Sequence, residues 1–125
     1  MPATYSYTLS SGLFQIPQNA ASVDWAVVND ATSAQTFVVT VYKAVLGAAK
    51  QLLMYAGATE TLNAGVSTHS ANPVGAGKTF DPGFYYEVVL QSNDKAVLPT
   101  VAAWDSGGRV VAGTRVGAGE FVSIS

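Results

Sequence analysis

Apolar residues recur at every second position over much of this chain, and this alternation limits the folds that it can adopt. Three runs show it clearly: Val23–Asn29, Thr36–Lys43 and Phe84–Gln91. Successive side chains of a β-strand point to opposite faces of a sheet, so a period of two predicts strands with one buried face. β-branched and aromatic residues fill these runs, as a pleated, half-buried surface favours. We therefore expect a protein built mainly from β-strands.

The same alternation predicts which side chains share a face of the sheet. One face of each of the first two runs is expected to carry Val23, Trp25 and Val27, and Phe37, Val39 and Val41. Tyr85 and Tyr86 are adjacent, so a regular strand sends them to opposite faces and only one of them can be a core residue.

Turn-forming residues separate the runs about every eight to twelve positions, which is typical of a sandwich, a jelly roll or a small barrel. The chain has 125 residues, within the usual range of one domain. We predict an all-β fold, a single antiparallel β-sandwich or jelly-roll-like domain of about eight to ten short strands. The domain is expected to span residues 1–125, with residues 1–7 as a short N-terminal arm.

Turn formers also predict the connections in the first part of the chain. The cluster Asn29–Ser33 follows the first alternating run, so the first two runs are expected to form a hairpin or to lie side by side in one sheet. Ser10–Gly12 is expected to separate a short N-terminal pair of strands, Tyr5–Leu9 and Leu13–Ile16.

The segment Lys43–Tyr55 allows two interpretations. Its apolar residues fit a helical stripe, but Gly47 and the strand-like flanks favour a strand–turn–strand around Leu46–Ala48. Two more short strands are expected at Thr59–Leu62 and Val66–Ser70.

The last third of the chain is predicted to contain three strands. The first runs from about Val97 to Trp104, and Asp105–Gly108 then supplies the residues of a tight turn. Arg109–Ala112 is expected to return as a strand, and Glu120–Ser125 to close the fold.

Charge and cysteine content exclude several classes of protein. Only 11% of the residues are charged, with 6 Lys and Arg against 8 Asp and Glu, so we expect no nucleic-acid partner. Polar or glycine residues interrupt every apolar run within about ten residues, so we expect no insertion into a membrane either. Few charges also mean weak repulsion between copies, which favours a homo-oligomer or polymer. The absence of cysteine excludes disulfides and thiolate sites. We find no signal peptide, and the sequence leaves the location open, with a cell or spore surface favoured.

The residues that usually carry catalysis are few and scattered. Gly75–Thr79 ends like a phosphate-binding loop, but Asn72 stands where the full pattern needs a glycine, so we expect an inter-strand loop. His69 is the only histidine, and the spacing of the carboxylates nominates no pair. We therefore predict no enzymatic activity, no catalytic residue, no metal site and no cofactor.

Aromatic residues are the remaining candidates for a binding site. An exposed Tyr or Trp can stack on the face of a sugar ring while its polar atom stays in contact with water. We expect Tyr85 and Trp104 to be the residues for such stacking, with a glycan as the partner.

The run from Ala26 to Tyr42 carries a resemblance to a known group of proteins. It combines a valine–asparagine pair, a short polar turn, Ser-Ala-Gln-Thr, alternating valines and a tyrosine. The second half repeats this layout with Tyr86–Val89, a strand that ends in Trp104–Gly108, then Val110–Gly113 and Phe121. Over about residues 22–125 the chain resembles small β-sandwich proteins of spore-forming Gram-positive bacteria, such as the subunits of endospore appendages.

The resemblance implies a jelly-roll-like sandwich whose copies pair through sheet edges, with an N-terminal arm that reaches into a neighbour. The appendage subunits are typically cross-linked through cysteines in that arm. This chain has no cysteine and its arm before Tyr5 is very short, so covalent cross-linking is impossible and arm exchange is in doubt.

We therefore expect a non-enzymatic structural subunit that assembles into a fibre, coat or surface assembly through sheet edges and low-charge faces. The residues expected to contact neighbouring subunits are Tyr5, Tyr7, Phe121 and Ile124. The alternative function is a carbohydrate-binding or adhesive module.

Overall fold

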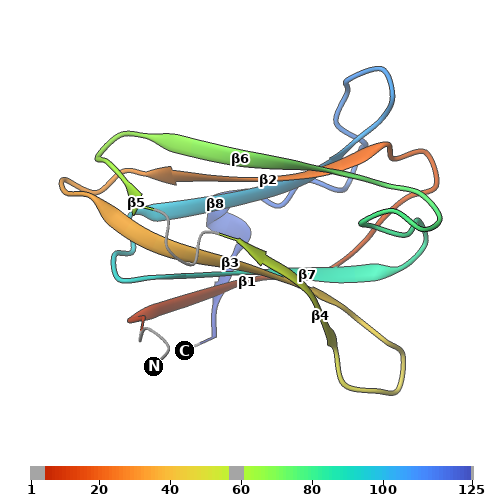
Figure 1. Ribbon diagram of the computed structural model, residues 1–125, viewed down its shortest axis with the longest axis horizontal. Helices are drawn as coiled ribbons and strands as arrows, with labels where there is room; N and C mark the ends of the chain where they lie inside the picture. The colour runs from red at the N-terminus through yellow and green to blue at the C-terminus, as the bar shows by residue number, and fades with distance from the viewer. Residues whose placement is uncertain (1–4, 57–60, 125) are drawn as a thin grey trace.

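The computed structural model of the protein describes residues 5–56 and 61–124, and these residues form two antiparallel sheets packed face to face (Figure 1). The strands are β1 (Tyr7–Gln15), β2 (Ser22–Asn29), β3 (Gln35–Lys43), β4 (Gln51–Ala56), β5 (Thr61–Leu62), β6 (Ser67–Pro73), β7 (Tyr85–Ser92), β8 (Val97–Trp104) and β9 (Val122–Ser123). A single-turn 3₁₀ helix, η1 (Ala118–Glu120), precedes β9. The prediction of an all-β sandwich is confirmed.

The two sheets differ in size. The larger has the strand order β4-β3-β7-β1-β9, with β5 paired to β3, and the smaller has the order β6-β2-β8. Figure 1 shows β6, β2 and β8 lying above β3, β7 and β1. The core lies between these layers.

In β2 and β3 the residues that the alternation places on one face of each strand point into the core. Val23, Trp25 and Val27 of β2 and Phe37, Val39 and Val41 of β3 are all buried. Tyr86 is fully buried and Tyr85 is exposed, so only one of this pair is a core residue. The Tyr86 ring packs edge-on against Phe80 with 4.7 Å between centroids, and its hydroxyl accepts a hydrogen bond from the Asp81 N–H.

The first two alternating runs do not pair with each other, and the prediction of a hairpin or of neighbouring strands is wrong. β2 lies between β6 and β8, whereas β3 lies between β4 and β7 in the other sheet. Each strand has one apolar face. Two such faces can be buried as neighbours in one sheet, or against each other when the strands lie in two sheets that face across the core. Asn29 helps to hold the connection by which the chain passes from one sheet to the other. Its buried amide donates to the carbonyls of Ser33 and Leu62 and accepts from the Ala31 N–H.

The N-terminal pair of strands is one strand, β1, with a bulge where the sequence predicts a turn. Ser10 is opposite Val89 and Leu13 is opposite Glu87, so β1 has one extra residue at this point. Gly12 has a φ of +69°, which a bulge of this kind favours. The turn-forming residues Ser10–Gly12 therefore predict the correct position of an irregularity, but the structure there is a bulge within one strand and not a turn between two strands.

The ambiguous segment is a strand–turn–strand, as predicted. β3 ends at Lys43, β4 begins at Gln51, and Gly47 has a φ of +73° in the turn between them. The Gly75–Thr79 segment is an inter-strand loop, closed by a bridge between Val74 and Phe80. Of the predicted strands that follow, Thr61–Leu62 and Ser67–Pro73 are present, and residues 59 and 60 lie outside the described residues.

The C-terminal prediction is partly wrong. Asp105 forms the expected tight turn, since its carboxylate accepts from the Gly107 and Arg109 N–H groups. Arg109–Ala112 is not a strand and forms one bridge to β8, between Val110 and Trp104. The last strand is only Val122–Ser123, because η1 occupies the residues before it. The segment satisfies part of its backbone by isolated bonds, such as the one from the Val111 N–H to the Ala103 carbonyl, without forming a ladder.

Candidate functional site

Two recessed surfaces lie on opposite sides of the sandwich, one on each sheet. The first, which we call the apolar groove, lies beside the β3–β4 turn and has a volume of about 810 Å³. Its lining residues are Leu13, Lys43, Ala44, Val45, Leu46, Gly47, Ala48, Lys50, Gln51, Gly83, Phe84 and Tyr85. They come from β1, the β3–β4 turn and the start of β7, so three segments far apart in the sequence form one surface.

The groove exposes large apolar side chains. Leu46 is fully exposed at the turn, and Leu13, Phe84 and Tyr85 each expose about half of their surface or more. Such side chains are common singly on protein surfaces, but a contiguous group marks a contact region. Tyr85, which the sequence proposes for ligand stacking, is therefore one wall of an apolar surface.

Both lysines of the groove are already paired with carboxylates. Lys43 Nζ lies 2.9 Å from Asp81 Oδ2 and 4.1 Å from the centroid of the Phe84 ring. Lys50 Nζ lies 2.7 Å from Glu87 Oε1 and 4.3 Å from the centroid of the Tyr42 ring. The hydrogen bond to Asp81 raises the pKa of Lys43, against the opposing effect of burial. An occupant of this groove therefore needs no charge of its own.

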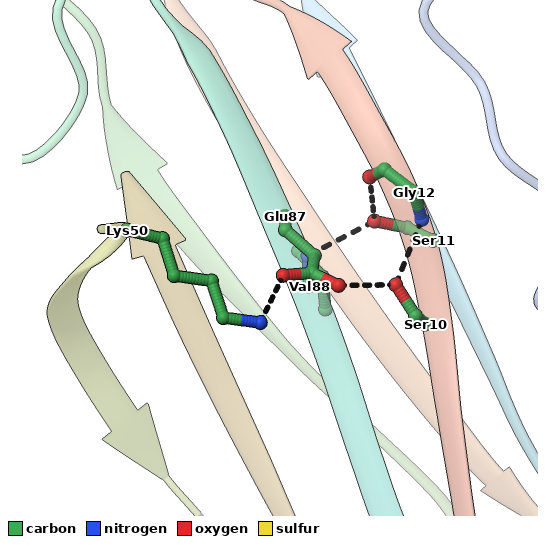
Figure 2. A network of polar contacts seen from close by, with 6 residues as sticks. All are labelled: Ser10, Ser11, Gly12, Lys50, Glu87 and Val88. Carbon is green, nitrogen blue, oxygen red and sulfur yellow. Dashed lines mark hydrogen bonds and ion pairs between the residues drawn. The ribbon is translucent and has the colours of Figure 1, made fainter. Parts of the chain in front are cut away.

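Figure 2 shows the network around Glu87, which holds the β3–β4 turn against β7 and β1. Glu87 accepts from Lys50 on one oxygen and from the Ser10 hydroxyl, at 2.5 Å, on the other. Burial raises the pKa of Glu87, but the hydrogen bonds from Lys50 and Ser10 and the Lys50 charge outweigh it, so the pKa of Glu87 lies below its ordinary value.

The bulge in β1 supplies the rest of this network. The Ser11 hydroxyl accepts from the Val88 N–H and donates to the Gly12 carbonyl, while the Gly12 N–H donates to the Ser10 hydroxyl (Figure 2). The two serines thus replace the ladder bonds that the extra residue disrupts, and they place a hydroxyl beside Glu87.

The larger sheet ends in an open edge at β4, which borders the groove. Within the described residues β4 pairs with β3 alone, so its other side presents unpaired backbone groups. Its six residues include no charge and no proline, and Leu52 is 54% exposed. Lysine and proline, which often protect such an edge, are therefore absent from β4, although the strand has one extra residue, Leu53, where its register with β3 shifts.

The opposite edge of the larger sheet is formed by β9 and β1. β9 covers only Leu9 and Ser10 of β1, and the Ile124 N–H donates to the Thr8 carbonyl. Val122 and Ile124 expose more than half of their surface.

The four residues predicted to contact neighbouring subunits do not share one environment. Tyr7 is exposed and opens β1, Ile124 is exposed beside it, and Tyr5 is half-buried. Phe121, which lies in the sequence between η1 and β9, is buried in the core of its own chain. Its side chain is therefore not part of the exposed edge. The alternation of residues in the sequence could not show this, because the strand that follows is only two residues long.

The second recessed surface, which we call the Trp104 hollow, lies on the smaller sheet and has a volume of about 490 Å³. Its lining residues are Asp24, Ala26, Ser67, Thr68, His69, Thr100, Val101, Ala102, Trp104, Val110 and Arg115. Trp104 and Tyr85, the two residues proposed for stacking, therefore lie on different sheets and form separate surfaces.

The Trp104 hollow contains His69 and the Asp24 carboxylate together with hydroxyl groups, which are the residue types of a hydrolase. No hydrogen bond joins His69 to a carboxylate or a hydroxyl among the residues that the structure describes. Within residues 5–56 and 61–124, no group of three or more His, Asp or Glu residues is arranged to hold a metal ion. No helix in these ranges is long and apolar enough to cross a membrane.

No protein-family model, curated protein or solved structure matches this chain. The resemblance to endospore-appendage subunits therefore stays a prediction from the sequence.

Proposed function

We propose that the protein is a non-enzymatic structural subunit that assembles with copies of itself through the two edges of its larger sheet. The observation that carries the proposal is the open β4 edge, an uncharged strand bordered by an apolar groove whose lysines are already paired. Pairing with a strand of a second copy would satisfy the free backbone groups of β4 and cover Leu52.

The two edges of the larger sheet differ, so pairing β4 of one copy with β9 and β1 of the next joins unlike surfaces. A contact between unlike surfaces does not close on itself unless the rotation between copies forms a ring, so its simplest product is a filament. Both edges carry exposed apolar residues, Leu52 on one and Val122 and Ile124 on the other.

The size of the surface fits this role. A stable contact buries about 800 Å² on each partner, and the described protein exposes 6900 Å². Two adjacent strands alone bury less than this, so the apolar groove would supply the remainder. The low net charge of −2 gives little repulsion between stacked copies.

The absence of cysteine in the sequence permits a direct test of which surfaces meet. We would prepare Leu52→Cys and Ile124→Cys as separate proteins, mix them under mild oxidation and measure the disulfide-linked heterodimer. The proposal expects the heterodimer to dominate. Val110→Cys, an exposed position in the loop beside β8 of the other sheet, is the control partner for each protein and should cross-link weakly. Equal cross-linking in all mixtures would contradict the proposed pairing of edges.

A further inference from the structure

The Trp104 hollow is built as a concave surface on the outside of the smaller sheet. Val23, Trp25 and Val27 point into the core, so Asp24 and Ala26 face outwards from β2. On the neighbouring β8, Thr100, Ala102 and Trp104 alternate with buried residues in the same way. Alanines at the middle of both strands leave a shallow floor, and larger side chains surround it.

Asp24 holds a hydrogen-bond acceptor that the protein does not use. Its Oδ1 atom is shielded from solvent and has no hydrogen-bond partner. Buried polar atoms nearly always have a partner, and an unsatisfied one has a substantial free-energy cost. Oδ1 itself is out of reach of a ligand, but Asp24 as a whole is half-buried and lines the hollow, so the accessible part of its side chain can accept a donor from a ligand.

Arg115 lines the same hollow and carries the opposite charge to Asp24. It is exposed, and the ion pairs among the described residues join Lys43 to Asp81 and Lys50 to Glu87, so Asp24 and Arg115 do not form one. A carboxylate and a guanidinium that share a hollow without touching leave room for a group that can donate to one and accept from the other. A hydroxyl group does both.

Trp104 adds an aromatic ring to this pair of polar groups. An indole offers a large apolar surface, against which the C–H face of a sugar ring can pack. The volume of about 490 Å³ lies in the usual range of small-ligand sites. An anion would be opposed by Asp24 and a cation by Arg115, so the site suits an uncharged ligand rich in hydroxyl groups.

We infer that the Trp104 hollow binds a neutral pyranose sugar of a glycan chain, with Trp104 stacked on the ring, Asp24 accepting from a hydroxyl and Arg115 donating to one. The hollow is on the smaller sheet, and the surfaces proposed for assembly are on the larger one. The site is therefore independent of assembly and stays open in an assembled subunit, which would display many copies of it.

The test is a titration of the purified protein with cellotetraose and with N-acetylchitotriose, followed by calorimetry and tryptophan fluorescence. The sequence has two tryptophans and Trp25 is in the core, so a fluorescence change reports on Trp104. We expect saturable binding of at least one sugar. Asp24→Asn keeps the shape of the hollow and should weaken binding about tenfold or more, and Trp104→Ala should weaken it by a similar factor.

Tyr85→Ala, which removes an exposed aromatic residue from the other sheet, is the control and should leave the affinity unchanged. Circular dichroism and thermal unfolding would show that each variant is folded. No binding of either sugar up to about 10 mM, or binding that is unaffected in both Asp24→Asn and Trp104→Ala, would overturn the inference. Release of shorter sugars during incubation would overturn it in another way, because it would make His69 and Asp24 part of a hydrolase.

Discussion

Leu52→Lys is the substitution that acts most directly on the proposed assembly edge. Leu52 is 54% exposed in the isolated subunit. Complete burial of a leucine side chain contributes about 1.5–3 kcal/mol, so covering its exposed half on assembly would contribute about 1 kcal/mol. Lysine loses this contribution and places an ammonium group against a neighbouring strand, at a further cost of about 2 kcal/mol if the charge stays partly solvated.

The combined loss of about 3 kcal/mol corresponds to an approximately 100-fold weaker contact. We would measure assembly against protein concentration by light scattering for the wild type, Leu52→Lys and Val110→Lys. Val110 is exposed in the loop beside β8, away from both edges of the larger sheet, so the same substitution there should leave assembly unchanged. The unfolding free energy of dispersed Leu52→Lys should stay within about 0.5 kcal/mol of the wild type, since the position is on the surface. Equal assembly of Leu52→Lys and the wild type would refute this reasoning.

Two further predictions concern the fold that supports this edge. Phe80→Ala should lower the unfolding free energy by about 3–5 kcal/mol, because Phe80 is fully buried and its ring packs against Tyr86; a loss below about 1 kcal/mol in denaturant titrations would contradict the packing. Glu87→Gln should lower stability at neutral pH by about 1 kcal/mol, since it weakens the ion pair with the half-exposed Lys50. The pKa of Glu87 is lowered in the folded protein, so its contribution is present above the ordinary pKa of a glutamate and is lost as the pH falls through the lower pKa of the folded state. Thermal unfolding should therefore show the gap between wild type and Glu87→Gln narrowing in acid, and a constant gap would count against this network.

The local structure of the chain was predictable because it depends on residue parity. The buried faces of β2 and β3 follow from alternation, and so does the division of Tyr85 and Tyr86 between surface and core. The turn at Gly47 was also predictable, because a glycine between two strand-like runs argues against a helix.

Pairing between strands was not predictable, because alternation identifies a buried face but not the strand that covers it. β2 and β3 could have lain side by side, and the buried Asn29 side chain, which helps to place them in different sheets, resembles any other asparagine of a turn. At Ser10–Gly12, the same residues that suit a turn suit a bulge.

The two recessed surfaces were missed for the same reason. Leu13, Leu46 and Phe84 form one groove only because β1, the β3–β4 turn and β7 meet. Asp24 and Arg115 are 91 positions apart (115 − 24) and share the Trp104 hollow through the packing of the C-terminal loop. Neither set has a spacing in the sequence that points to a site.

The particle size of the purified, untagged protein tests the central claim most directly. We would measure it by light scattering over a range of concentrations and image the same samples by negative-stain electron microscopy. The proposed pairing of β4 with the β9 and β1 edge predicts filaments, or large closed particles if the rotation between copies forms a ring. A monomer near 12.9 kDa at all concentrations would contradict it.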